Sequence, residues 1–176
     1  MIDDVEVYLN GLNTVEANFI QDDITNSILS EGKFYMMRPN KLRIDYKIPN
    51  EISLYVNGKV ITYYDKELDE ISNIPTTSTP LHFLLKENIS LNDKNIIVEK
   101  VIDNKTNIIL TLREKDKEDN GILTILFKKN PISLKSINIK NEVGQEIEME
   151  FLNMEVNKSI KKSIFDFISP RLKRKI

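Results

Sequence analysis

The hydrophobic positions of this chain change their period after the first dozen residues. Residues 4–10 have the spacing of a short amphipathic helix, which Asp3 or Asp4 can cap and Gly11 can end. Its predicted apolar face consists of Val5, Leu9 and Leu12. Over residues 15–20 apolar and polar side chains alternate, which is the pattern of a β-strand.

The rest of the chain is predicted to form short strands joined by tight turns. Asn57-Gly58 and Asn120-Gly121 are hairpin signals, because Asn and Gly both tolerate positive φ angles. Further turns are expected at residues 48–50 and 130–131. The other strand candidates are residues 34–37, 42–47, 52–56, 59–65, 107–113, 122–127, 137–140 and 147–151.

Two of these strands indicate how the sheet is covered. In residues 147–151 the apolar side chains face one way and glutamates the other, which is typical of a sheet with one wet side. Residues 122–127 are apolar on both faces, so we expect other elements to pack over both sides of this strand.

One short helix interrupts the strands between residues 72 and 87. Thr79 is its predicted cap and Pro80 its first residue. Residues 81–85 are apolar on more than one side, so the helix is expected to lie on the hydrophobic face of the sheet. The predicted fold is therefore mainly β: one domain over residues 1–176, in which a curved antiparallel sheet wraps around short helices.

The composition of the chain excludes several kinds of binding partner and reactive site. A net charge of −2 gives no bias towards nucleic acid or anionic membranes, and no nucleic-acid partner is expected. The chain has no cysteine, which excludes disulfides, thiolate catalysis, cysteine metal sites and a lipid anchor on cysteine. His82 is the single histidine, expected to be a partly exposed residue of the short helix, and we predict no metal and no cofactor. The charged run 113–119 is expected to be a solvated hairpin tip.

Residues 38–46, which run Arg-Pro-Asn-Lys-Leu-Arg-Ile-Asp-Tyr, and the hairpin 56–65 carry a resemblance to a known family. They are similar to the LolA family, the periplasmic carriers of outer-membrane lipoproteins. Ile44 stands where Trp is common in that family, and Asn57 stands where Asp is usual. The other matching segments are 12–21, 32–34, 65–70, 80–85 (the family's lid helix), 144–145, 151–153 and 165–170 (its closing strand).

The resemblance implies an unclosed barrel of about 11 strands, with short α-helices forming a lid over a hydrophobic cavity. It also implies a monomeric periplasmic carrier without catalytic activity. Such a carrier accepts acylated lipoproteins from an inner-membrane ABC transporter and delivers them to an outer-membrane acceptor. The sequence opens with Met-Ile-Asp-Asp and shows no signal peptide, as expected of a processed periplasmic protein or of a cytoplasmic one.

The resemblance assigns one latch residue and a set of cavity residues. Arg38 is expected to hydrogen-bond the backbone of the lid and of the first helix and so to close the empty cavity; the alternative is an ordinary surface ion pair. The lid residues Leu81, Phe83, Leu84 and Leu85 are the first candidates for acyl contact. The other cavity candidates are Phe19, Phe34, Met36, Leu42, Ile44, Tyr46, Leu54, Val56, Ile125, Phe127, Met149 and Phe151.

Three other functions agree less well with the sequence. An outer-membrane acceptor of the same fold needs an N-terminal cysteine, which this chain lacks. A lipid- or lipoprotein-sensing regulatory protein of the cell envelope is the main alternative, although such proteins usually carry a second domain. An enzyme is disfavoured because no paired carboxylates, nucleophile or cofactor loop stands out. The basic residues 171–176 are expected to form a flexible tail.

Overall fold

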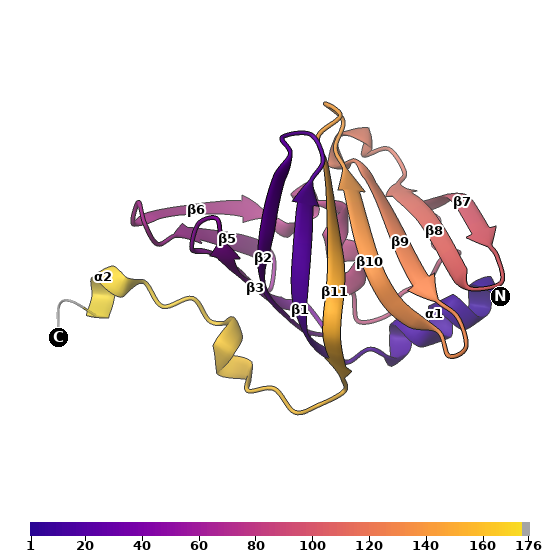
Figure 1. Cartoon of the computed structure of the whole chain (residues 1–176), viewed down its shortest axis with the longest axis horizontal. Coiled ribbons are helices and arrows are strands. Elements are labelled where there is room, and N and C mark those ends of the chain that lie inside the picture. Colours follow the sequence, from indigo (N-terminus) through magenta and orange to yellow (C-terminus); the bar gives the residue numbers. More distant parts are fainter. Residues whose placement is uncertain (174–176) are drawn as a thin grey trace.

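The computed structural model describes residues 1–173, and eleven antiparallel strands in this range form one strongly curved sheet (Figure 1). Of the predicted 171–176 tail, residues 174–176 lie outside the described range. The strands are β1 (Thr14–Asp23), β2 (Ile28–Met37), β3 (Lys41–Ile48), β4 (Ile52–Asn57), β5 (Val60–Asp65), β6 (Glu70–Pro75), β7 (Ile96–Asp103), β8 (Asn107–Glu114), β9 (Ile122–Lys128), β10 (Ser133–Lys140) and β11 (Glu146–Val156).

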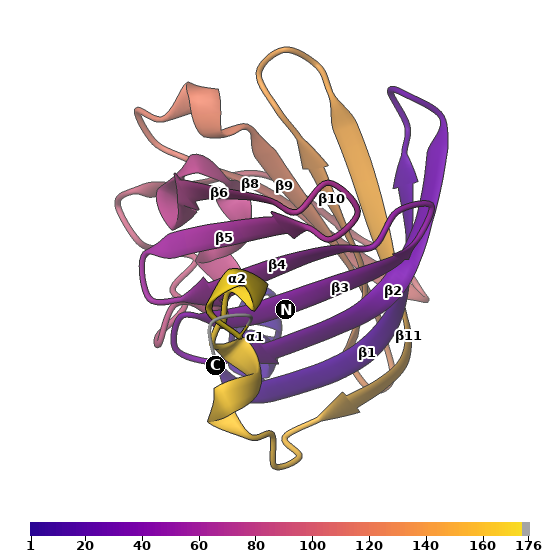
Figure 2. The ribbon, with the colours of Figure 1, turned by 90° about the vertical axis from the view of Figure 1, so that its left-hand side faces the viewer.

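The strand order is β6-β5-β4-β3-β2-β1-β11-β10-β9-β8-β7. Every neighbour pair is consecutive in the chain except β1 and β11, which bring the beginning and the end of the sheet together at its middle. The sheet curls without closing, with β6 and β7 as its two edges (Figure 2). This confirms the predicted fold, a mainly β unclosed barrel, and it leaves a concave face to be filled.

Helix α1 (Ile2–Gly11) and the segment after β6 fill the concave face. Val5 and Leu9 of α1 join the core as predicted, and Tyr8 packs edge-on against Phe127 with 5.9 Å between ring centroids. The predicted cap is wrong: Asp3 and Asp4 lie inside the first turn, and Met1 occupies the N-cap position. Acidic residues in a first turn still stabilise a helix through its dipole.

The predicted lid helix is a 3₁₀ helix, η2 (Pro80–Leu85), which follows the short turn η1 (Thr76–Ser78). Its predicted start is confirmed, since Pro80 is the first residue and the Thr79 hydroxyl accepts a hydrogen bond from the backbone N–H of Leu81 at 3.3 Å. We call residues 79–86 the lid. It closes over the concave face beside β9.

Several local predictions need correction. Strands β6 and β7 were missed, because β6 is an almost entirely exposed edge strand and β7 is exposed over much of its length, so neither shows a clear alternation. The Asn120-Gly121 turn does join β8 to β9, but through the longer 3₁₀ turn η3 (Glu118–Asn120). On β9 the inward side chains are buried, whereas Ile122 and Leu126 on the outer face are only half-buried.

Residues 165–170 are not a strand, contrary to the resemblance. After β11 the chain crosses the outer face of β3 and β4 as an irregular strap, defined here as residues 158–170, which contains the 3₁₀ turn η4 (Lys162–Phe165) (Figure 2). Phe165 is fully buried there. The Phe167 ring packs on Tyr55 and Tyr64 at 5.3 and 5.4 Å. The chain then forms the short helix α2 (Pro170–Lys173), where Arg171 donates to Asp69 at 3.3 Å.

Gly32 on β2 is required by the close approach of β3. A Cβ atom at this position would lie 1.9 Å from the backbone oxygen of Asp45. We therefore expect Gly32→Ala to lower the free energy of unfolding by about 1–3 kcal/mol, measured by urea denaturation. Gly11→Ala is the control, because its Cβ meets no atom within 4 Å, and its effect should stay below about 1 kcal/mol. Equal effects of the two substitutions would contradict the close approach.

Candidate functional site: a hydrophobic cavity under the lid

An apolar cavity of about 190 Å³ lies between the concave face of the sheet and the lid. Strands β3, β4 and β5 contribute one wall, and β10 and β11 contribute the opposite wall. Because side chains of a strand alternate between faces, every second residue of these strands points into the cavity. Its lining residues are Gln21, Leu42, Ile44, Tyr46, Leu54, Val56, Ile61, Ile74, Thr79, Leu81, Ile137, Ile139, Ile147 and Met149.

The structure divides the predicted cavity residues into two groups. Seven of them do line the cavity: Leu42, Ile44, Tyr46, Leu54, Val56, Leu81 and Met149. The others pack in the hydrophobic core away from its lining: Phe19, Phe34, Met36, Phe83, Leu84, Leu85, Ile125, Phe127 and Phe151. Aromatic pairing explains part of this division, since Phe34 and Phe151 pack edge-on at 4.9 Å and so fill the space between them.

Several lining residues were missed. Ile147 shares the inward face of β11 with Met149, and the alternation of that strand could have identified it. Ile137 and Ile139 follow the same alternation on β10. Gln21 carried no such signal, because a polar residue is not expected in an apolar lining. It becomes a site residue only because β1 lies between β2 and β11 in the middle of the curved sheet, where its side chain meets that of Tyr46 on β3.

The size of the cavity sets what it can hold in this state. A dry apolar cavity of roughly 150 Å³ accommodates a benzene molecule. About 190 Å³ therefore suits part of one acyl chain, and a chain of about a dozen methylenes needs additional space. The lid, which contributes Thr79 and Leu81 to the lining, would have to move for larger cargo to enter.

A second hollow of about 350 Å³ adjoins the cavity at the rim of the sheet. Both hollows are lined by Gln21, Tyr46 and Leu54, so these three residues stand between them. The outer hollow is more polar at its edge, where Ser30 and Asn50 lie, and its rim residue Ile48 is half exposed. The two hollows therefore lie next to each other on the concave face, one under the lid and one at the rim.

Arg38 lies at the end of β2, beside the C-terminus of α1. Its Nε donates to the carbonyl oxygen of Leu12 at 2.8 Å, and its backbone N–H donates to Asn13 at 2.9 Å. Burial lowers the pKa of the guanidinium group, and within the described residues its buried Nη1 atom has no hydrogen-bond partner. Of the two contacts that the resemblance implies, the structure contains the one to the end of the first helix.

The lid itself is held by the backbone next to Arg38. The N–H of Asn40 donates to the carbonyl oxygen of Leu85, the last residue of η2, at 2.9 Å. Arg38 and Asn40 flank the same Arg-Pro-Asn turn, so this turn connects α1 to the lid. Within the described residues the guanidinium group of Arg38 is incompletely hydrogen-bonded, and such a buried donor costs free energy.

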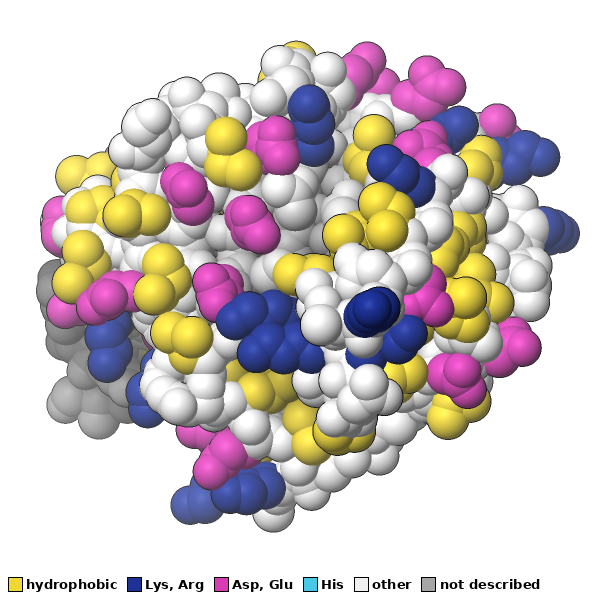
Figure 3. Space-filling view, turned by 45° about the vertical axis from the view of Figure 1, so that its right-hand side comes forward, with side chains coloured by type: hydrophobic (Ala, Val, Ile, Leu, Met, Phe, Trp, Pro, Cys, Tyr) yellow, Lys and Arg dark blue, Asp and Glu magenta, His cyan; other side chains and the backbone are white. Residues whose placement is uncertain are grey.

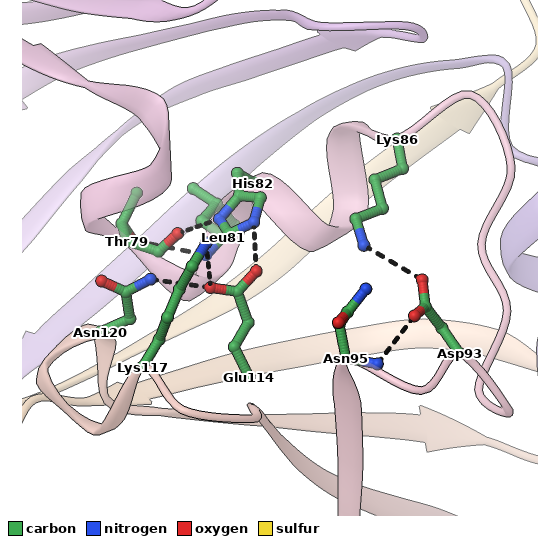
Figure 4. A network of polar contacts seen from close by, with 9 residues as sticks. All are labelled: Thr79, Leu81, His82, Lys86, Asp93, Asn95, Glu114, Lys117 and Asn120. Carbon is green, nitrogen blue, oxygen red and sulfur yellow. Dashed lines mark hydrogen bonds and ion pairs between the residues drawn. The ribbon is translucent and has the colours of Figure 1, made fainter.

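A polar network holds the other end of the lid (Figure 4). His82 is largely buried, with 13% of its side chain exposed; its Nδ1 lies 2.6 Å from the Thr79 carbonyl oxygen and its Nε2 lies 2.8 Å from Glu114 Oε1. Both ring nitrogens of His82 therefore lie within hydrogen-bonding distance of an oxygen atom. Asn120 and Lys117 also contact the Glu114 carboxylate, at 2.8 and 3.3 Å.

The prediction that residues 113–119 form a solvated tip is wrong for Glu114, because this residue is buried at the end of β8. Burial raises the pKa of its carboxyl group, but the hydrogen bonds from Asn120 and Lys117 and the electrostatic interactions with His82 and Lys117 outweigh this effect. The pKa of Glu114 therefore lies below its ordinary value. No sequence pattern indicated that His82 and Glu114 would meet, since 32 positions separate them.

Removing the His82 ring is expected to loosen the lid. His82→Ala should speed hydrogen exchange of the backbone amides of residues 81–86 by about 10- to 150-fold, because a hydrogen bond to a charged group is worth about 1.5–3 kcal/mol. Exchange monitored by mass spectrometry on peptides covering the lid tests this. Lys117→Ala is the matched control, since half of the Lys117 side chain is exposed and little protection should be lost. Equal exchange in both variants would mean that His82 does not anchor the lid.

The same network predicts an acid sensitivity of the lid. A carboxyl group whose pKa is lowered by folding stabilises the folded state fully above its unfolded-state value of 4.5, and this contribution disappears as the pH falls through the lower, folded-state value. Lid protection should therefore fall below about pH 4.5 in the wild-type protein. In Glu114→Gln the pH-dependent part of this loss should be absent. An unchanged pH profile in that variant would assign the sensitivity to another carboxylate.

The described residues show no arrangement suited to metal chemistry or to a membrane-spanning helix. Among residues 1–173 no group of three or more His, Asp or Glu side chains is placed to hold a metal ion. No helix in the same range is long and apolar enough to cross a membrane. On the face shown in Figure 3, basic and acidic side chains are interspersed with hydrophobic ones.

Comparisons with known proteins agree with this fold. The model of the family "Outer membrane lipoprotein carrier protein LolA" matches residues 10–168. An uncharacterised protein of Rickettsia prowazekii is 28% identical over 133 residues, which cover 75% of this chain and 60% of that protein. The outer-membrane lipoprotein carrier protein of Methylococcus capsulatus is 25% identical over 171 residues, which cover 93% of this chain and 81% of that protein.

Several solved structures share the fold. One of them is a putative outer-membrane lipoprotein-sorting protein domain from Vibrio parahaemolyticus, with a TM-score of 0.56, 10% sequence identity and 94% of each chain covered. Since the family model spans most of the sequence, the chain belongs to the LolA family of outer-membrane lipoprotein carrier proteins. The chain spans about 60% of the length of its Rickettsia relative.

Proposed function

We propose that this protein is a periplasmic carrier that shields the acyl chains of lipoproteins during their transfer between membranes. The observation that carries the proposal is the apolar cavity closed by a lid, in a chain that belongs to the LolA family. The relative from Methylococcus capsulatus is described as an outer-membrane lipoprotein carrier protein. An inner-membrane ABC transporter would load the carrier, and an outer-membrane acceptor would receive the cargo.

The physical problem of such a carrier is to move apolar chains through water without holding them too firmly. Each buried methylene contributes about 0.8 kcal/mol, so an acyl chain contributes on the order of 10 kcal/mol. A carrier that bound much more tightly than a membrane could not deliver its cargo. A small resting cavity beneath a lid held by a few polar contacts suits this requirement, because opening the lid costs free energy that offsets part of the burial.

No catalytic chemistry is proposed for this site. Its lining is apolar apart from Gln21, Tyr46 and Thr79, and these side chains can form hydrogen bonds with a ligand. Binding and release are then the whole activity, and the groups that hold the lid decide the balance between them. Arg38 and His82 are the two side chains to which we assign this role.

Displacement of a fluorescent fatty-acid probe by a triacylated lipopeptide tests the proposal. The same peptide without acyl chains is the ligand control, and only the acylated form should displace the probe. Ile147→Gln places a polar amide in the cavity and should weaken probe binding, whereas Glu148→Gln places the same side chain at the next position, on the opposite face of β11, and should not. Absence of probe binding, or equal competition by the bare peptide, would refute the acyl-carrier function.

A further inference from the structure

One polar pair stands between the two hollows of the concave face. The hydroxyl of Tyr46 on β3 donates a hydrogen bond to Oε1 of Gln21 on β1 at 2.8 Å. Both residues line both hollows. On the inner side of the pair the lining is aliphatic except for Thr79, and on the outer side the lining becomes mixed and reaches the rim. The pair therefore marks the boundary between an apolar compartment and a more polar one.

The Tyr46 side chain is fixed in this position. Its ring packs edge-on against Phe19, with 5.2 Å between the ring centroids. Burial raises the pKa of the Tyr46 hydroxyl to about 12, against the opposing effect of its hydrogen bond with Gln21. The hydroxyl thus remains a neutral donor over the whole physiological pH range.

The bond from Tyr46 orients the Gln21 amide. Because the hydroxyl engages Oε1, the NH₂ group forms the other end of the amide, and in residues 1–173 it donates no hydrogen bond to another residue. An amide NH₂ group is a donor only, and it pairs with acceptors such as carbonyl oxygens. At the mouth of an apolar cavity, the acceptor that follows a hydrocarbon chain is the carbonyl group of its ester or amide linkage.

We propose that Gln21, oriented by Tyr46, donates a hydrogen bond to the ester or amide carbonyl at the head of a bound acyl chain. The hydrocarbon then lies in the inner cavity, and the polar head of the cargo occupies the outer hollow. This inference rests on the proposed carrier function and specifies how the cargo is positioned in the site. Gln21 is the residue that contacts the ligand, and Tyr46 is a positioning residue.

The pair also gives the cavity a means of selection. A neutral hydrogen bond contributes about 0.5–1.5 kcal/mol, which corresponds to about 2- to 12-fold in affinity. Chains that carry a carbonyl at the correct distance gain this factor, and plain hydrocarbons do not. A site that needs only hydrophobic burial would bind both kinds of ligand according to their apolar area.

The test compares two ligands of equal chain length, a long-chain methyl ester and the corresponding alkyl methyl ether, which lacks the carbonyl group. Wild-type protein should bind the ester several-fold more tightly than the ether by calorimetry or probe displacement. Gln21→Met keeps the size of the side chain but removes the donor, so the ester should lose about 2- to 12-fold in affinity while the ether loses none. Tyr46→Phe should reduce the same preference in part.

A spectroscopic measurement separates hydrogen bonding from packing. The infrared carbonyl stretch of the bound ester should lie at lower frequency in the wild-type protein than in Gln21→Met, because a donated hydrogen bond weakens the carbonyl bond. Equal ester preference and equal carbonyl frequency in the two proteins would overturn the inference while leaving the carrier function intact. Binding of neither ligand by the wild-type protein would overturn the carrier function and the inference together.

Discussion

Replacing Phe165 with alanine is expected to lower the free energy of unfolding by about 3–5 kcal/mol, the range for removing a fully buried phenylalanine ring. Phe165 is completely inaccessible although it lies in the strap and not in a strand. The strap reaches the outer face of β3 through the carbonyl oxygen of Ile164, which accepts a hydrogen bond from Arg43 Nη1 at 3.1 Å. The side chain of Asp166, which directly follows η4, accepts a hydrogen bond from the Asn57 side chain at 2.6 Å.

Urea denaturation of Phe165→Ala measures this effect, and Ile168→Ala is the matched control. Ile168 lies three residues further along the same strap and is 59% exposed, so its truncation should change the free energy of unfolding by no more than about 0.5 kcal/mol. A loss below about 1 kcal/mol for Phe165→Ala would show that the strap does not contribute to the stability of the sheet. The large value would establish the strap as part of the folded unit.

Replacing Arg38 with leucine is expected to slow release of acylated cargo by about tenfold or more. In the closed arrangement the guanidinium group donates to the Leu12 carbonyl oxygen, and a hydrogen bond from a charged group is worth about 1.5–3 kcal/mol. If this bond breaks when cargo enters, it favours the empty state. Leucine removes it, so the loaded state becomes more stable relative to the empty state by the same amount, and 1.4 kcal/mol corresponds to a factor of ten.

Transfer of a fluorescent lipopeptide from the carrier to lipid vesicles measures the effect of Arg38→Leu. Loading should change little, whereas the transfer rate should fall. Lys41→Leu is the control, because Lys41 is a half-buried cation at the start of β3, close to the same turn, for which the described residues show no ion pair. Faster transfer by Arg38→Leu, or an equal change in both variants, would contradict the role of Arg38 as a latch.

Local patterns determined much of the sheet. Asn57-Gly58 and the alternation around it predict the β4–β5 hairpin, because both the turn geometry and the side-chain period are local properties of the chain. Strands β6 and β7 escaped prediction because they are the edges, where exposure removes the alternation. The strap escaped for a related reason: it packs through isolated aromatic residues and has no repeating pattern.

The candidate site depends more strongly on tertiary structure. The sequence identified Leu42, Ile44 and Val56 as inward residues of adjacent strands, and they do line the cavity. It also assigned the buried phenylalanines to the cavity, where the structure instead packs them in the core. Hydrophobicity alone cannot separate these two roles, because the same types of apolar residue line a cavity and fill a core. The two groups differ only in whether neighbouring side chains fill the space between them.

By itself, the sequence determined the Arg-Pro turn at Arg38 and the start of the lid at Thr79, because each depends on residues close together in the chain. It also determined the class of the fold and the membership of a carrier family, because the order of short motifs along the chain can be read without the structure. Only the tertiary structure brought Gln21 to Tyr46 and His82 to Glu114. Those pairs join residues on different elements, and their geometry follows from the curvature and strand order of the whole sheet, which no local pattern encodes.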